Sequence, residues 1–446
     1  MQANPQLRAL NRFGLGARPG EAGAIDPRSW LRQQINPNAT RMKGLELPSA
    51  QDLAETVMSS RARDDKAQAR KELRKLGRET FGREATAAIA HAMTTDNPFA
   101  ERLVRFWSNH LAVSTVGEPV VSLTAGAYER EAIRPHVFGR FEDMVQASAR
   151  HPAMLIYLDQ VRSFGPNARA ARNNRRGLNE NYARELLELH TLGVDGGYDQ
   201  RDVEQLALIL TGWTIGGYIR QGAEGAATPF TFVDAMHEPG SKTLLGRRYP
   251  EGGEMEGSAA ISALCRHPST ARFIATKLVR HFVSDQPHPL DVDIIAGVYL
   301  DTDGDLAEVS LALLDLDGAL YGPERKIRSP QDFLIAMGRC LGLTSIQRKG
   351  LAGLISLRHA PWSPGSPAGF GDTAVEWGDP DGLLCRVDLA RLVVRSSRTI
   401  LPDAGGFAAS VMEVRNPALL NAMLAEQSSA VDKTALIFAS PDFQWR

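Results

Sequence analysis

The chain has 446 residues, with 51 basic and 52 acidic side chains and a formal net charge of -1. This length exceeds the usual size of one compact core, so one large helical domain or two subdomains is expected. The balanced charge gives no general electrostatic reason to bind nucleic acid or an anionic membrane, and no stretch is apolar enough to span a bilayer.

The sequence shows no disulfide pattern and no export signal. Cys265, Cys340 and Cys385 are far apart and odd in number, which predicts buried free thiols rather than a disulfide framework or a zinc ribbon. The first residues lack the basic region and apolar run of a signal peptide, which predicts a cytoplasmic protein. A periplasmic location is the alternative, because a chain whose signal had been removed would look the same.

Two helical segments are predicted early in the chain. Residues 61–92 mix basic and acidic side chains, a pattern typical of a long exposed helix, with a basic docking surface as the alternative. Asn97 followed by Pro98 marks the start of the next helix. Spacings of three, four and seven place the following residues on its buried face: Phe99, Leu103, Phe106, Trp107 and His110. An inward histidine of this kind is either a core group bonded to a carbonyl or a functional group.

Residues 141–159 predict two helical pieces broken at His151-Pro152. The loop 162–177 that follows is rich in Arg, Asn and Gly. Its arginines are consistent with either a solvated loop or a binding site for an anion or acidic partner. They are Arg169, Arg172, Arg175 and Arg176.

The most informative segment is residues 179–193, which we call the Glu180 helix. At 100° per residue, one face of this helix carries Glu180, Asn181, Arg184, Glu185 and Glu188. Arg184 is then one turn from both Glu180 and Glu188, where opposite charges attract. His190 lies on the apolar side and cannot share a ligand with Glu188. The polar face either meets water or lines a cleft.

A further helix and a small sheet follow the Glu180 helix. Asp199 is a good N-cap, and Gly212 can end the helix in the left-handed conformation. Residues 230–233 and 243–245 predict the two strands of a β-hairpin around residues 237–242.

The last third of the chain predicts more helices and one long loop. His267-Pro268 starts a helix in which Lys277 and His281, four residues apart, approach a largely apolar face. Residues 359–380 are dense in Gly and Pro and include aromatic residues; loops of this length are usually functional or wrap a surface. Two further helices complete the chain.

Together these patterns predict an all-α, multi-helix fold with a minor β-hairpin and a long Gly/Pro-rich loop. Residues 1–446 are expected to form a single domain. A subdivision into a helical part at 1–215 and a helical part with the small hairpin at 216–446 is the finer expectation.

The chain resembles a bacterial family known as domain of unknown function 1800, nearly end to end. The motifs that carry this resemblance are Asn11-Arg12-Phe13-Gly14-Leu15-Gly16, Phe106-Trp107-Ser108-Asn109-His110, His151-Pro152-Ala153-Met154-Leu155, Tyr157-Leu158-Asp159, the Glu180 helix, Leu210-Thr211-Gly212-Trp213, His237-Glu238-Pro239-Gly240, His267-Pro268-Ser269-Thr270-Ala271-Arg272, Arg280-His281-Phe282, Asp303-Gly304-Asp305-Leu306 and Ala439-Ser440-Pro441-Asp442-Phe443.

The resemblance implies a location and a partner but no activity. Members often look exported, and their genes often lie beside those of a sulfatase- and phosphatase-like family, which implies a protein partner from that family. It also favours a buried or cleft-lining role for the polar face of the Glu180 helix, because a face that met only water would have little physical reason to be a family signature.

The first functional hypothesis is an enzyme, such as a hydrolase, with its site on the Glu180 helix. The predicted catalytic residues are Glu180, Arg184, Glu185 and Glu188. The predicted substrate-binding residues are Asn181, Trp213 and Lys242. The predicted ligands of a divalent metal are His110, His237, Glu238 and His281, because imidazole and carboxylate groups can hold a metal that activates water.

The second hypothesis is a non-catalytic protein that binds a partner or a ligand. In it, the charges around Arg184 form a structural network, and the aromatic loop with Trp362 and Trp377 docks a protein. An anion bound by Arg184 and Lys242 is a further variant. No zinc-protease, serine-hydrolase, phosphate-loop or dinucleotide motif selects between these hypotheses.

Overall fold

The computed structural model describes residues 4–42, 46–173, 177–217, 228–322, 326–346, 348–397, 401 and 403–446. Helices make up most of this part of the chain, which confirms the all-α prediction. In the first half they are α1 (Pro5–Arg8), α2 (Pro27–Arg32), α3 (Ala50–Ala62), α4 (Lys66–Thr94), α5 (Pro98–His110), α6 (Pro119–Tyr128), α7 (Phe141–Arg150), α8 (Pro152–Tyr157), α9 (Asn181–Glu185) and α10 (Gln200–Leu210).

After α10, the described part of the chain is again mostly helical, with short strands between α10 and α11. Its helices are α11 (Glu254–Cys265), α12 (Pro268–Phe282), α13 (Pro289–Asp301), α14 (Leu306–Asp315), α15 (Asp317–Tyr321), α16 (Pro330–Cys340), α17 (Arg348–Ser356), α18 (Ala374–Trp377), α19 (Pro380–Ser397), α20 (Ala404–Val411), α21 (Pro417–Ala425), α22 (Ala430–Ala439) and α23 (Pro441–Gln444). The strands are β1 (Trp213–Thr214), β2 (Thr231–Phe232), β3 (Lys242–Leu244) and β4 (Arg247–Tyr249).

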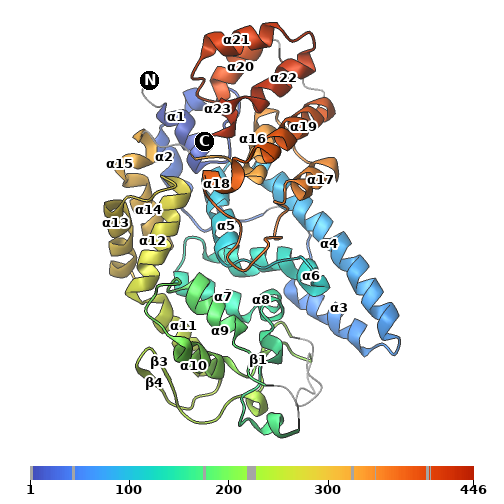
Figure 1. Cartoon of the computed structure of the whole chain (residues 1–446), viewed down its shortest axis with the longest axis vertical. Helices are drawn as coiled ribbons and strands as arrows, with labels where there is room; N and C mark the ends of the chain where they lie inside the picture. Colours follow the sequence, from blue (N-terminus) through green and yellow to red (C-terminus); the bar gives the residue numbers. More distant parts are fainter. Residues whose placement is uncertain are drawn as a thin grey trace.

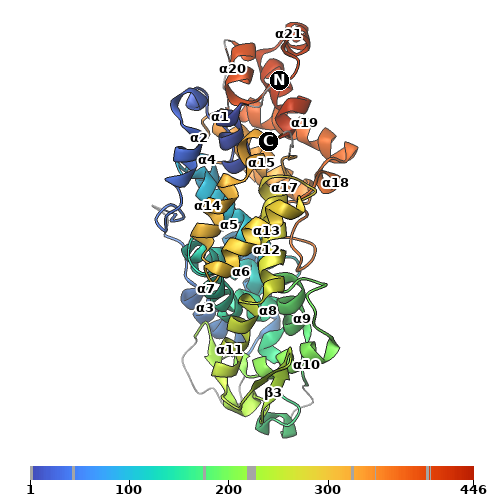
Figure 2. The ribbon, with the colours of Figure 1, turned by 90° about the vertical axis from the view of Figure 1, so that its left-hand side faces the viewer.

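The molecule is elongated, and both ends of the chain lie in the same half of it. Figure 1 shows α1 and α2 beside the C-terminal helices α19 to α23, whereas α10, α11 and the strands lie at the opposite end. Figure 2 shows the same long axis, with α12 in the middle of the body. Helices α3 and α4 form an arm that extends from the body in Figure 1.

The buried apolar side chains form two large clusters. The first contains Phe106, Trp107 and Phe282 and runs through the middle and strand-bearing parts of the molecule. The second joins α1 to α16, α19 and α22, with Phe333 and Phe438 at its centre. Residues from both sequence halves enter the first cluster, and the subdivision at residue 215 stays a prediction.

Several helix boundaries follow from local signals that the sequence contains. The break between α7 and α8 occurs at His151-Pro152 as predicted, where the His151 Nδ1 atom accepts a hydrogen bond from the Ala153 N–H. Asp199 caps α10 through a capping box with Asp202, and Gly212 after that helix has a φ of 89°. Asn97 precedes α5 as predicted, but its side chain makes no cap hydrogen bond.

The predicted pairing of residues 230–233 with 243–245 is wrong. β2 pairs antiparallel with β1, and β3 pairs antiparallel with β4. Leu245 and Gly246 both have positive φ angles, at 49° and 73°, which is the backbone of a tight two-residue hairpin turn. This turn folds the chain back at once, so β3 meets the strand that follows it.

Two further expectations need correction. After the long loop, the described residues form the five helices α19 to α23 instead of the two predicted. Cys265 and Cys340 are buried free thiols as predicted, whereas Cys385 is exposed. Within the described ranges, no helix has the length and apolar character needed to cross a membrane.

Candidate functional site

A cavity of about 530 Å³ lies between α5, α12, the start of α16 and the loop 357–373. Its volume falls within the range of small-molecule sites. The polar groups that line it are Arg102, Arg105, Asn109, His110, Glu129, Lys277, Arg280, His281, Asp285, Asp332, His359, Asp372, Glu376 and Arg446.

Lys277 and His110 face each other across the cavity wall. The Lys277 Nζ atom lies 3.0 Å from His110 Nδ1, and His110 Nε2 lies 3.1 Å from the His190 carbonyl oxygen. The carbonyl can only accept, so His110 carries its proton on Nε2 and its Nδ1 accepts from Lys277. Burial and the neighbouring Lys277 hold the His110 pKa well below 6.5, so the ring is neutral.

Burial also lowers the pKa of Lys277, to about 8. Asp372 opposes this shift, and Arg280 on the next turn of α12 adds to it. The amine is therefore much easier to deprotonate than an exposed lysine. His110 supplies a neutral acceptor, which orients the amine without pairing its charge.

His281 and Asp372 form a second pair in the cavity. His281 Nδ1 donates to Asp372 Oδ2 over 2.8 Å, and the carboxylate thereby fixes the tautomer. The Nε2 atom of His281 is buried and has no hydrogen-bond partner among the described residues. Burial lowers the His281 pKa to about 4, and that of Asp372 lies at about 2 because His281, Lys326 and Arg446 stabilise its charge against the effect of burial.

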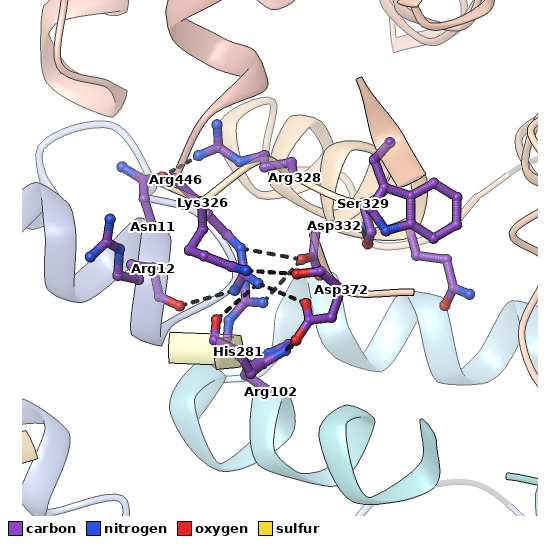
Figure 3. Close-up of polar contacts among 12 residues, drawn as sticks. Asn11, Arg12, Arg102, His281, Lys326, Arg328, Ser329, Asp332, Asp372 and Arg446 are labelled. Atoms are coloured by element: carbon purple, nitrogen blue, oxygen red, sulfur yellow. Dashed lines mark hydrogen bonds and ion pairs between the residues drawn. The ribbon is translucent and has the colours of Figure 1, made fainter. Parts of the chain in front are cut away.

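Figure 3 shows a buried charge network that contributes Arg102, Asp332, Asp372 and Arg446 to the cavity lining. Asp332 Oδ2 lies 3.0 Å from Arg102 Nη1 and 3.8 Å from Arg446 Nε. Arg446 also approaches Asp372, at 3.8 Å, and Lys326 pairs with Asp285. The C-terminal residue reaches this place because Trp445 forms an antiparallel bridge with Ile327.

Three cationic side chains that line the cavity take no part in this charge network. In the part of the chain that the structure describes, Arg105, Lys277 and Arg280 form no ion pair with a carboxylate; Arg105 bonds to the Gln331 side chain. The lining carboxylates, in contrast, are all hydrogen-bonded or paired within the chain. Glu129 pairs with Arg134, and the exposed Glu376 caps α18 by accepting from Thr373. The free side of the cavity is therefore positively charged.

The Gly/Pro-rich loop covers the cavity and is bonded to its walls. Trp362 Nε1 donates to Glu129 Oε2 over 2.9 Å. Gly369 has a φ of 81°, and a Cβ atom there would lie 2.3 Å from the Asn109 carbonyl oxygen, so the close approach of this loop to α5 requires glycine. The Trp377 ring stacks on His359 with 4.6 Å between ring centroids.

A family model matches residues 8–445, which is nearly the whole chain. The chain belongs to the family described as protein of unknown function (DUF1800). No curated protein and no solved structure matches it.

In this DUF1800 protein the charged ladder of the Glu180 helix lies outside the cavity lining. Arg184 contacts Glu180 at 3.2 Å and Glu188 at 3.6 Å, as the periodicity predicts, and also bonds to Gln200 of α10. The Arg184 side chain is 37% exposed and that of Glu180 34%. Glu185 is half-buried, and burial together with Glu188 raises its pKa. Asn181 begins α9 and is exposed.

The Glu180 helix is not a uniform α-helix. Residues Leu186–His190 form a π-helical turn, which the ideal wheel did not anticipate. His190 is buried, as predicted, on the side away from the carboxylates. Its carbonyl oxygen is the one that His110 bonds, so the end of this helix contacts the cavity through the backbone.

Other predicted site residues lie together in a second, fully buried cluster. Lys242 Nζ is 2.9 Å from Glu256 Oε2, and His237 Nε2 is 3.1 Å from Glu256 Oε1. Glu238 accepts two hydrogen bonds from Asn167. Trp213 is completely buried in the first apolar cluster.

The four predicted metal ligands are thus divided between two places, with His110 and His281 at the cavity and His237 and Glu238 at the buried cluster. Among the described residues, no group of three or more His, Cys, Asp or Glu side chains is placed to hold a metal ion. The metal and catalytic assignments of the sequence stay predictions.

Lys277 and His281 had a signal in the sequence, their four-residue spacing on one face of α12. His110 also had one, the three- and four-residue spacing of the buried face of α5, and the Gly/Pro-rich loop was flagged by its length. Asp332, Asp372 and Arg446 come from a helix start, a loop and the C-terminus, and no short-range pattern joins them.

Proposed function

We propose that this protein binds a small molecule carrying a carboxylate or phosphate group in the cavity between α5 and α12. The observation that carries the proposal is the set of three cations, Arg105, Lys277 and Arg280, that line the cavity without carboxylate partners in the described chain. A half-buried cation without a counter-ion is costly, and an anionic ligand would remove that cost.

The alternative of a purely structural charge network is less well supported at this place. Such a network would pair its cations with its carboxylates, as Arg102 and Asp332 are paired. The aromatic loop is also a weaker candidate for docking a partner protein, because the Trp362 and Trp377 side chains bond to groups within the chain. Hydrolysis assisted by a metal stays a prediction from sequence.

Titration calorimetry with inorganic phosphate, at constant ionic strength, tests the proposal. Loss of one charge-assisted hydrogen bond costs about 1.5–3 kcal/mol, so Arg280→Gln is expected to weaken phosphate binding roughly ten- to hundredfold. Arg272→Gln on the same helix is the matched control, because Arg272 is exposed and pairs with Asp293. The control is expected to bind phosphate like the unmodified protein.

Two results would contradict the proposal. One is the absence of phosphate binding to the unmodified protein at concentrations up to the millimolar range. The other is equal weakening in Arg280→Gln and Arg272→Gln, which would indicate a general effect of surface charge and not a site.

A further inference from the structure

One face of α12 brings three different functional groups to the cavity. Lys277, Arg280 and His281 are separated by three and four residues, so their side chains lie on the same side of the helix. An amine, a guanidinium group and an imidazole therefore border one cavity, which Arg105 of α5 also lines.

Lys277 differs from the other buried lysines near these sites. Lys242 contacts Glu256 and Lys326 contacts Asp285, so each of these amines has a carboxylate partner. Lys277 instead contacts the acceptor nitrogen of a neutral histidine. Its burial and the positive charge of Arg280 favour the neutral amine, which is the nucleophilic form.

We propose that Lys277 forms an imine with an anionic oxo compound, an aldehyde or ketone whose carboxylate or phosphate group binds Arg105 and Arg280. This proposal rests on the proposed function, because the anion site determines where the carbonyl carbon lies. It adds a covalent step and a substrate class to simple binding.

The chemistry balances without any further reagent. The Lys277 nitrogen attacks the carbonyl carbon, and the resulting carbinolamine forms when one amine proton moves to the oxygen. The carbon–oxygen bond then breaks, water leaves with a second proton, and a carbon–nitrogen double bond remains. His110 Nδ1, which lies 3.0 Å from the Lys277 Nζ atom, is the imidazole nitrogen placed to take up and return these protons.

The test is reductive trapping on the complete, unmodified protein. Glyoxylate is the anionic probe, acetaldehyde the uncharged probe, and borohydride reduces any imine to a stable secondary amine that peptide mass spectrometry locates. Lys433, on α22 and outside the cavity lining, is the internal reference lysine.

Glyoxylate is expected to label Lys277 at least about tenfold more than Lys433 at pH 7.5, because an amine with a pKa of about 8 has a roughly two-hundredfold larger neutral fraction than an ordinary lysine. Acetaldehyde is expected to lose most of this preference, since it lacks the anionic group. Phosphate should reduce labelling of Lys277 and leave Lys433 unchanged.

Two variants separate this proposal from the proposed function. Lys277→Arg retains the positive charge but cannot form an imine, so it should bind phosphate and show no trapped adduct at residue 277. Arg280→Gln should weaken phosphate binding and reduce the preference for glyoxylate together.

Equal labelling of Lys277 and Lys433, or equal preference for both aldehydes, would overturn the imine proposal. If phosphate binding still depends on Arg280 in that case, the result supports the anion site and refutes only the covalent step. If phosphate does not bind the unmodified protein, the proposed function is refuted, and with it the anion site on which the imine proposal depends.

Discussion

Four histidines at or beside the cavity are expected to make the fold less stable in mild acid. Burial lowers the pKa of His190 and of His359 to about 3 and that of His281 to about 4, and it lowers the pKa of His110 in the same direction. Each folded pKa lies below the unfolded value of about 6.5. The unfolded chain therefore binds these protons first, and stability that is present above pH 6.5 is lost as the pH falls.

The size of the effect at pH 5 depends mainly on the unfolded pKa. A histidine with a folded pKa of about 4 or lower reduces the free energy of unfolding by about 2 kcal/mol between pH 8 and pH 5. The three histidines with pKa values of about 3 to 4 together reduce it by about 6 kcal/mol, and His110 acts in the same direction. This loss is comparable with the whole stability of many domains.

Urea unfolding followed by circular dichroism at pH 8, 7, 6 and 5 measures this loss. The free energy of unfolding is expected to fall by about 4 kcal/mol per pH unit near pH 5, the slope for three protons taken up. His359→Gln should reduce the slope by about one proton. A slope that corresponds to less than about one proton would refute the reasoning.

Three further substitutions test individual contacts. Asp332→Ala leaves Arg102 and Arg446 without their shared carboxylate and should lower the free energy of unfolding in urea by about 3–5 kcal/mol; a loss below about 1 kcal/mol would contradict the buried network. Gly369→Ala places a methyl group 2.3 Å from the Asn109 carbonyl oxygen. It should lower the free energy of unfolding by about 1–3 kcal/mol and weaken phosphate binding. If neither quantity changes, the loop can move away from α5 without cost. Arg184→Ala should change the unfolding free energy by no more than about 1 kcal/mol, since its ion pairs are partly exposed; a larger loss would mean that the ladder supports the fold.

The helical fold could be predicted because its signals are local. A proline or a capping side chain begins α8, α10 and α12, and the buried face of α5 repeats every three to four residues. The strand pairing could not be predicted in the same way. Short aromatic and β-branched strands can pair with several other strands. The pairing of β3 with β4 is determined by the turn at Leu245-Gly246, where both residues have positive φ angles.

Only part of the candidate site could be predicted from the sequence, because many of its contacts join residues far apart in the chain. The ladder of Arg184 with Glu180 and Glu188 is a contact within one helix, so periodicity predicts it. The packing of α9 determines whether that face lines the cavity. Periodicity within one helix gives no information about how the helix packs on others. The pairs that line the cavity join residues far apart in sequence, such as His281 with Asp372 and Arg102 with Asp332.

The prominent Glu180 helix is still connected to the cavity, through its backbone and not through its carboxylates. The π-helical turn Leu186–His190 ends at His190, whose carbonyl oxygen accepts the Nε2 proton of His110. That bond places the acceptor nitrogen of His110 toward Lys277, since a neutral imidazole has one donor and one acceptor. A helix terminus with free carbonyl groups can hold a histidine tautomer in this way, whereas a surface ion pair cannot. We therefore propose that this segment positions His110 through the His190 carbonyl oxygen, and that its carboxylates take no part in the anion site.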